Sequence, residues 1–312
     1  MAPVKKKIAL LGATGHIAKN IIFWSCKESN YELCLFARSP ERVKAFLSTI
    51  GECSDVSVGN FEGFNDGVFD VVINCVGIGA PQKLKADLLT IFATTEYFDN
   101  LILNYLGHRP QTLYINLSSG AAYGTNFTVP VTQESFSTFG INNLDASEYY
   151  GITKINSEAK HRALHDLNIV DLRVFAFFSR FIDVEERFLL SEIISCIKNK
   201  KKFVTGPGDI TRDYVHVSDL MSMMDIIVNK MQVNDVFDVY SRKPARKFEL
   251  IDYFAERYGL KYSVMDTFEA LSVTGTKNSY FSLNKKAALL GYLPQYSSLE
   301  AIAEEAAIIL SS

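Results

Sequence analysis

The chain has 312 residues, which suffices for two domains or for one large α/β domain with a smaller appendage. Its formal net charge of −3 gives no basic surface of the kind that nucleic-acid binding needs. No apolar stretch approaches the roughly 20 residues of a membrane-spanning helix. We therefore expect neither a nucleic-acid partner nor a membrane partner.

The cysteines are odd in number and scattered along the chain. They offer neither a disulfide framework nor the spacing of a zinc site. We therefore expect a reduced, cytoplasmic protein without a metal. The five residues are Cys26, Cys34, Cys53, Cys75 and Cys196.

Short apolar runs alternate with helical patterns in the first half of the chain. The runs cover residues 7–11, 33–37, 56–58, 71–76, 113–117 and 172–175. They are nearly continuous in apolar residues, as parallel strands covered on both faces are. The helical patterns cover residues 15–27, 40–47, 84–106 and 146–167. This alternation predicts an α/β fold with a doubly wound parallel sheet of the Rossmann type.

The pattern changes after residue 175. Helical patterns at 185–199, 217–230, 248–258 and 299–310 are separated by shorter, mixed segments. We expect a dinucleotide-binding domain over 1–175 and a smaller α/β substrate-binding domain over 176–312, with 213–231 returning to the first. A cleft between the two is the expected ligand site.

A glycine motif links the first strand to the first helix. Gly12 permits a tight turn, Gly15 lets the backbone approach a diphosphate, and the small Ala18 allows close packing of the helix. A plain strand–turn–helix without a ligand is the alternative. The predicted cofactor contacts in this motif are Gly12, Thr14, Gly15, His16 and Ile17.

The end of the second strand bears on which dinucleotide is bound. A carboxylate there would accept the ribose 2′-hydroxyl of NAD, but this chain has Arg38 and Ser39. A guanidinium beside a hydroxyl suits a 2′-phosphate, so NADP(H) is favoured over NAD(H), although NAD(H) remains open. The alternative is an exposed arginine at a strand end. By position alone, further cofactor contacts are expected at Asn60, Phe61, Cys75, Val76 and Gly77.

Tyr150 and Lys154 lie one helical turn apart, and Ser119 ends the fifth strand. An ammonium close to a phenol favours the phenolate, so Tyr150 can exchange a proton with a substrate oxygen that Ser119 holds. Ser119, Tyr150 and Lys154 are therefore the predicted catalytic trio, and Tyr150 and Lys154 are also expected to touch the cofactor. Tyr149 has no lysine four residues later, and it either packs or touches the substrate.

Three further segments complete the pattern: 119–124 (Ser-Gly-Ala-Ala-Tyr-Gly), 211–219 (Thr-Arg-Asp-Tyr-Val-His-Val-Ser-Asp) and 289–294 (Leu-Leu-Gly-Tyr-Leu-Pro). With them the chain resembles, over nearly its whole length, the extended short-chain dehydrogenases/reductases. That family holds NAD(P)-dependent nucleotide-sugar epimerases, dehydratases and reductases. The resemblance implies a nucleotide-sugar substrate and a homodimer formed through the helices at 84–106 and 146–167.

The resemblance also assigns roles around the trio. It makes Ser119 the catalytic hydroxyl and places Ser118 beside the cofactor, with Gly120 and Ala121 beside the substrate. It sets Arg212 against the substrate diphosphate. The alternative is an ion pair between Arg212 and a carboxylate such as Asp209 or Asp213. His216 and Asp219 are read as structural.

The chain departs from the family's pattern at several points. Dehydratases carry an Asp-Glu pair where this chain has Gly120 and Ala121, so 4,6-dehydration is not expected. Ala176 stands where an asparagine usually touches the diphosphate, and Lys277 is the only cation in 274–280. The favoured reaction is NADP(H)-dependent reduction of a 4-keto sugar. The alternative is a 4-epimerase that retains its NAD(P), and a non-catalytic cofactor sensor ranks below both.

Overall fold

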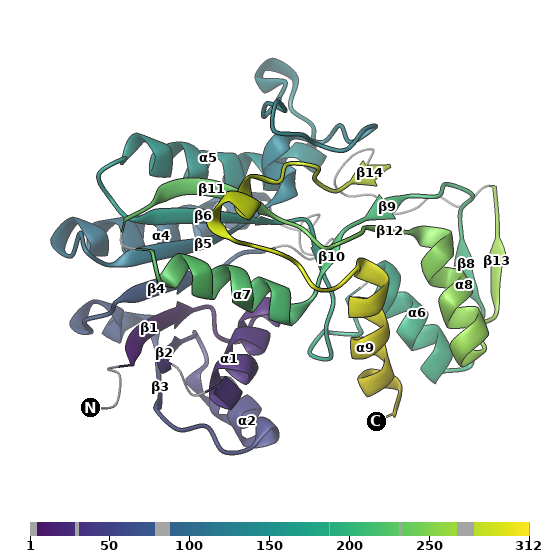
Figure 1. Cartoon of the computed structure of the whole chain (residues 1–312), viewed down its shortest axis with the longest axis horizontal. Helices are drawn as coiled ribbons and strands as arrows, with labels where there is room; N and C mark the ends of the chain where they lie inside the picture. Colours follow the sequence, from purple (N-terminus) through teal and green to yellow (C-terminus); the bar gives the residue numbers. More distant parts are fainter. Residues whose placement is uncertain are drawn as a thin grey trace.

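Figure 1 shows the computed structural model, which describes residues 5–28, 31–78, 88–186, 188–230, 232–266 and 278–311. Seven parallel strands form the main sheet in the order β11-β6-β5-β4-β1-β2-β3. Their bounds are β1 Lys6–Leu11, β2 Tyr31–Phe36, β3 Val56–Gly59, β4 Val71–Asn74, β5 Leu113–Ser119, β6 Ile169–Val174 and β11 Asn234–Val239. The doubly wound Rossmann sheet predicted from the sequence is confirmed.

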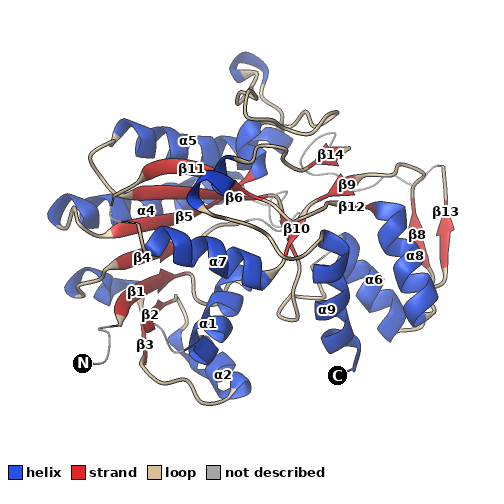
Figure 2. Cartoon of the chain, in the orientation of Figure 1, coloured by secondary structure: helices blue, strands red, loops and turns tan. Residues whose placement is uncertain are grey.

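Helices cover both faces of this sheet, as Figure 2 shows. The helices α1 (His16–Glu28), α2 (Pro40–Ile50) and α7 (Val217–Val228) pack on one face. The helices α4 (Leu88–His108) and α5 (Tyr149–Ala163) lie on the other. The strands carry the core: all seven residues of β5 are buried.

The chain builds a second apolar core beyond the sheet. The elements around it are α6 (Leu189–Lys198), α8 (Lys247–Tyr258), α9 (Ser298–Ser311) and the paired strands β8 (Phe203–Thr205) and β13 (Tyr262–Val264).

Short strands connect the two parts: β7 (Ala176–Phe177) pairs with β10 (Tyr214–Val215), and β9 (Thr211–Arg212) lies between β12 (Ala245–Arg246) and β14 (Ser279–Tyr280). Because α7 and β11 return to the first part, the chain crosses between the parts more than once.

Several predicted boundaries are wrong, two of them between α5 and β6. The helix expected to reach residue 167 ends at Ala163, because the side-chain amide of Asn234 donates to the carbonyls of His161, Leu164 and Leu167. The following strand then begins three residues earlier than expected. For the helix expected over 84–106, residues 84–87 lie outside the described part of the chain.

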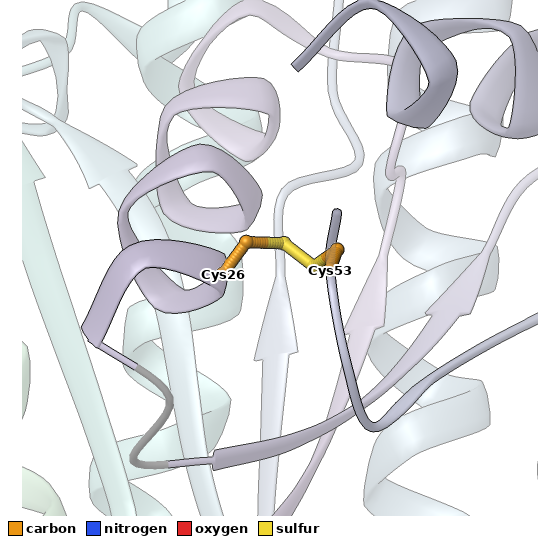
Figure 3. The surroundings of a disulfide bond; sticks show 2 residues. All are labelled: Cys26 and Cys53. Carbon is orange, nitrogen blue, oxygen red and sulfur yellow. A yellow bond between two sulfur atoms is a disulfide. The ribbon is translucent and has the colours of Figure 1, made fainter. Parts of the chain in front are cut away.

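The cysteines also differ from the prediction. Cys26, near the end of α1, and Cys53, in the loop before β3, form a disulfide with their Cα atoms 4.9 Å apart (Figure 3). The two segments meet only because β1, β2 and β3 pair side by side, a contact that sequence spacing does not reveal. The expectation of five reduced cysteines is therefore wrong for this pair.

Within the described ranges, no helix is both long and apolar enough to cross a membrane.

Candidate functional site

The predicted site residues gather where the strands of the sheet end. Gly12 follows β1, Gly77 lies just beyond β4, and Ser119 closes β5. In parallel sheets these carboxyl ends meet at one edge, which is where such folds bind ligands. The amino-terminal turn of α5 brings Tyr150 to the same edge, since α5 packs against the 3-10 turn that follows Ser119.

The glycine motif forms a close cradle between β1 and β4. Gly12 has φ +80°, and a β-carbon there would lie 3.0 Å from the carbonyl carbon of Cys75. A β-carbon on Gly15 would lie 3.2 Å from the Gly12 oxygen. Only glycine allows this tight turn and leaves no side chain over its backbone. The backbone at the start of α1 therefore fits a dinucleotide diphosphate.

His16 turns its ring away from that cradle and toward the second part of the chain. Its Nε2 lies 2.8 Å from Ser179 Oγ, and its ring meets the edge of Phe177 at 5.2 Å. Burial, reinforced by Lys19, lowers the pKa of His16 to about 4, so the ring is neutral. The neighbouring Ile17 packs against the core. The backbone of both residues lies at the start of α1, beside the cradle.

The next predicted cofactor contacts lie after β2 and β3. Arg38 is exposed at the end of β2, and Ser39 is the N-cap residue of α2. The Asn60 side chain accepts from the Gly63 amide, while Phe61 packs edge-on against Phe98 at 4.5 Å.

The segment after β4 passes close to Lys154. The Cys75 amide donates to Leu11, and Val76 packs against the core. A β-carbon on Gly77 would lie 3.6 Å from Lys154 Nζ. Of these three residues, Gly77 is the one that lies directly beside the lysine ammonium.

Lys154 is buried and firmly held. Its ammonium donates to the Leu117 carbonyl at 2.9 Å and lies 5.7 Å from the centre of the Tyr150 ring. Between them in the chain, Gly151 presses on the turn after β5, where a β-carbon would come within 2.4 Å of the Ala121 oxygen. Glycine at 151 thus lets α5 approach the end of β5 closely enough to face Ser119.

The two neighbouring serines have different partners. Ser118 donates to Glu158 at 2.5 Å, within a buried group that includes Arg173. Its side chain is therefore not available for the cofactor contact that the sequence analysis expected. Ser119 Oγ accepts from the Ala121 amide at 3.2 Å and lies 3.0 Å from the hydroxyl of Tyr280. Tyr280 is a site residue that the sequence analysis missed.

Arg212 lies beside Tyr280. The two residues are register partners in β9 and β14, and the guanidinium sits 5.5 Å from the ring centre. Burial lowers the pKa of Arg212. The carboxylates proposed as alternative partners are engaged elsewhere: Asp209 pairs with Arg246 at 3.3 Å, and Asp213 accepts from the Ser241 amide.

Several residues around the trio bear on the substrate. A β-carbon on Gly120 would lie 2.4 Å from the ring of Phe175, so a carboxylate cannot stand there unless that ring moves. Ala121 is buried, and Tyr149 packs edge-on against Phe92 at 5.6 Å, on α4. Lys277 lies outside the described residues.

His216, Glu304 and Glu305 place their possible ligand atoms within 4.8 Å of one another. Glu305, however, binds Arg180 with both oxygens. The Nδ1 of His216 accepts from the Ser218 amide, so in the neutral ring Nε2 carries the proton and cannot bind a metal. Asp219 accepts from the backbone amides of Gln295 and Tyr296.

A hollow of about 610 Å³ lies at the opposite edge of the sheet, where the strands begin. It is lined by residues such as Lys6, Asp70 and Arg109, and by none of the predicted site residues. The chemistry of the trio places the candidate site at the carboxyl edge instead.

The model of the NAD dependent epimerase/dehydratase family matches residues 8–241 of this chain. No curated protein sequence matches. Several solved structures share the fold at low identity. One is a UDP-glucuronic acid 4-epimerase of Bacillus cereus with NAD, in a mutant form, at 18% identity and TM-score 0.80 over 98% of this chain and 99% of that one.

Two others widen the range of reactions. The UDP-glucose 4-epimerase of Stenotrophomonas maltophila, with bound NAD and formylated UDP-arabinopyranose, has 15% identity and TM-score 0.81 over 98% of both chains. The dTDP-glucose 4,6-dehydratase of Bacillus anthracis, in complex with NAD, has 15% identity and TM-score 0.78 over 98% of this chain and 97% of that one.

Proposed function

Because the chain belongs to the NAD-dependent epimerase/dehydratase family, we propose that it is a nucleotide-sugar 4-epimerase that retains a nicotinamide dinucleotide. The observation that carries this proposal is the placing of Tyr150 and Lys154 on α5 against the end of β5, beside the glycine cradle. The sequence favoured net reduction of a 4-keto sugar. The similar structures that are 4-epimerases favour the alternative.

The residues present fit a dinucleotide. Gly12 and Gly15 would bring their backbone to its diphosphate, and Lys154 and Gly77 would border its nicotinamide ribose. When bound, the dinucleotide supplies a hydride acceptor and donor.

The trio supplies the proton chemistry. Tyr150 takes the proton from a sugar hydroxyl and later returns it to the carbonyl oxygen. The Lys154 ammonium favours the phenolate that this exchange requires. Ser119 hydrogen-bonds the same oxygen. Positioned acid–base groups of this kind contribute about 10²–10⁴-fold in rate.

Arg212 supports a substrate that carries a diphosphate. Its guanidinium is half-buried, close to Tyr280 and so to Ser119, and it can make a bidentate contact with phosphate oxygens. Similar structures contain UDP-sugar derivatives. We therefore propose a nucleoside diphosphate sugar as the substrate.

A second candidate is an NADP(H)-dependent 4-ketoreductase. Arg38, exposed where NAD-binding relatives of this fold place a carboxylate, favours it because a guanidinium suits a 2′-phosphate. A 4,6-dehydratase is disfavoured, since the position that would carry its acid is Gly120, packed under Phe175. A cofactor sensor without chemistry would not need Ser119, Tyr150 and Lys154 together.

We also propose a homodimer formed through α4 and α5. On the outer side of α4, Leu89 is 79% exposed and Tyr97 is 61% exposed, which a partner would cover. Sedimentation of the purified protein tests this. The cytoplasmic location was expected because all five cysteines were expected to be reduced. Since Cys26 and Cys53 form a disulfide, we propose no location.

The reaction is tested with purified protein. Its retained dinucleotide is released by denaturation and identified by mass, and the protein is incubated with UDP-sugars. Inversion at C4 without net consumption of added NADH or NADPH supports the epimerase. Stoichiometric consumption of NADPH with a 4-keto nucleotide sugar establishes the reductase instead.

A further inference from the structure

Tyr280 is fixed in place beside the catalytic serine. It ends β14, which pairs in parallel with β9, and its ring packs against Phe127 at 4.7 Å and Phe175 at 5.0 Å. The side chain is 6% exposed, and its hydroxyl lies 3.0 Å from Ser119 Oγ. Packing against these two rings holds the Tyr280 hydroxyl at one fixed position.

The direction of the hydrogen bond between the two hydroxyls follows from their neighbours. Burial raises the pKa of Tyr280, and the negative charge of a Tyr150 phenolate raises it further, so the Tyr280 phenol keeps its proton. A phenol is a stronger hydrogen-bond donor than an aliphatic hydroxyl, so in this pair the O–H of Tyr280 donates to Ser119 Oγ.

Ser119 then receives two hydrogen bonds. One comes from the Ala121 amide at 3.2 Å and the other from Tyr280. A serine hydroxyl has two acceptor positions and one donor. With both acceptor positions filled, the Ser119 proton has to point elsewhere, toward an oxygen outside this group.

We propose that Tyr280 is a positioning residue that directs the Ser119 hydroxyl as a donor toward the reacting oxygen of the substrate. A carbonyl oxygen only accepts, so a serine arranged as a donor matches the keto form of the sugar. A serine that could also act as an acceptor would match it less well. This inference rests on the proposed function, since both the epimerase and the reductase handle a 4-keto sugar.

The test is a double-mutant cycle in kinetics. Tyr280→Phe removes only the hydroxyl and should lower kcat about 10-fold, the effect of one hydrogen bond of roughly 1.4 kcal/mol, with little change in KM. Ser119→Ala should lower kcat at least as far. Because Tyr280 acts through Ser119, the double variant should be no slower than Ser119→Ala alone.

Tyr123→Phe is the matched control. Tyr123 belongs to the same aromatic cluster, but its hydroxyl bonds Asp238 at 3.0 Å. Its effects should multiply with those of Ser119→Ala, and thermal melting shows that each variant is folded.

Two outcomes would overturn the role of Tyr280: an unchanged kcat in Tyr280→Phe, or full multiplication of its effect with that of Ser119→Ala. If the wild-type protein turns over no nucleotide sugar, the proposed function fails and takes this role with it. Turnover with independent effects removes the role of Tyr280 alone.

Discussion

Glu158 lies one helical turn after Lys154 and grips Arg173 of β6, whose Nε is 3.0 and 3.1 Å from the two carboxylate oxygens. Both side chains are buried, and Glu158 also accepts from Ser118 at the end of β5. The helix that carries Tyr150 and Lys154 is thus fastened to the strand that carries Ser119.

Breaking this ion pair should be costly, because a buried charge would lose its partner. We expect Arg173→Met to lower the free energy of unfolding by about 3–5 kcal/mol. Chemical denaturation measures the loss. The control is Arg242→Met, which breaks an ion pair with Glu300 whose side chains are 57% and 51% exposed, and which should cost about 1 kcal/mol or less. Equal losses in the two variants would refute the anchoring role.

Gly12 should not tolerate even an alanine. Gly12→Ala forces a positive φ and brings its β-carbon to 3.0 Å from the backbone of Cys75, so we expect cofactor binding to weaken at least 10-fold. Gly51→Ala is the matched control: φ there is +92°, but no atom lies within 4 Å of the added carbon. Titration of each variant with NAD and NADP compares them. The cradle would be disproved if Gly12→Ala bound both dinucleotides as tightly as Gly51→Ala.

Arg38 should decide which dinucleotide is preferred. Arg38→Asp places a carboxylate at the end of β2, where it can accept the 2′-hydroxyl of NAD and repel a 2′-phosphate. We expect the affinity ratio of NADP to NAD to fall by at least 10-fold, as read by calorimetry. Arg42→Asp makes the same charge change at an exposed position on α2 and should leave the ratio unchanged. A wild-type protein with equal affinities for both would contradict the prediction.

His161 should make stability fall at alkaline pH. Burial lowers the pKa of its ring, but hydrogen bonds to Asp171 at 2.9 Å and Asp99 at 2.8 Å outweigh this and raise it to about 9. A raised pKa in the folded state stabilises fully below the unfolded value near 6.5 and is lost as the pH rises through 9.

We therefore expect the free energy of unfolding to drop by about 3 kcal/mol between pH 6.5 and 9.5. Denaturation at several pH values measures this slope. His165→Asn, at a side chain that is 80% exposed, should keep the slope, whereas His161→Asn should flatten it. A flat profile in the wild-type protein would show that His161 is not held in its charged form.

How far the sequence predicted this molecule depends on the range of each contact. Gly12 with Gly15, and Tyr150 with Lys154, lie about one turn apart, so a local pattern together with its place after a predicted strand marked them as candidates. Tyr280 reaches Ser119 from 161 residues away through a two-residue strand, and no local pattern marks it. The hydrogen bonds from Asn234 to the end of α5 and the Cys26–Cys53 bond were not predicted, for the same reason.

The sequence distinguished the roles of neighbouring residues on one strand only in part. Ser118 and Ser119 are adjacent, yet successive side chains of a strand face opposite sides. Family resemblance singled out Ser119 as the catalytic candidate, which stays a prediction, but Ser118 was also assigned to the cofactor. The acceptor that takes its hydroxyl, Glu158, comes from a helix 40 residues later.

The fate of the C4 hydrogen tests the central claim most directly. A UDP-sugar carrying deuterium at C4 is incubated with the wild-type protein, with Tyr150→Phe and with Tyr149→Phe, and the product is analysed by NMR and mass. We expect the wild-type protein and Tyr149→Phe to invert C4 and keep the label, and Tyr150→Phe to be at least about 10²-fold slower. Inversion with loss of the label, or equal rates in Tyr150→Phe and the wild-type protein, would contradict the account.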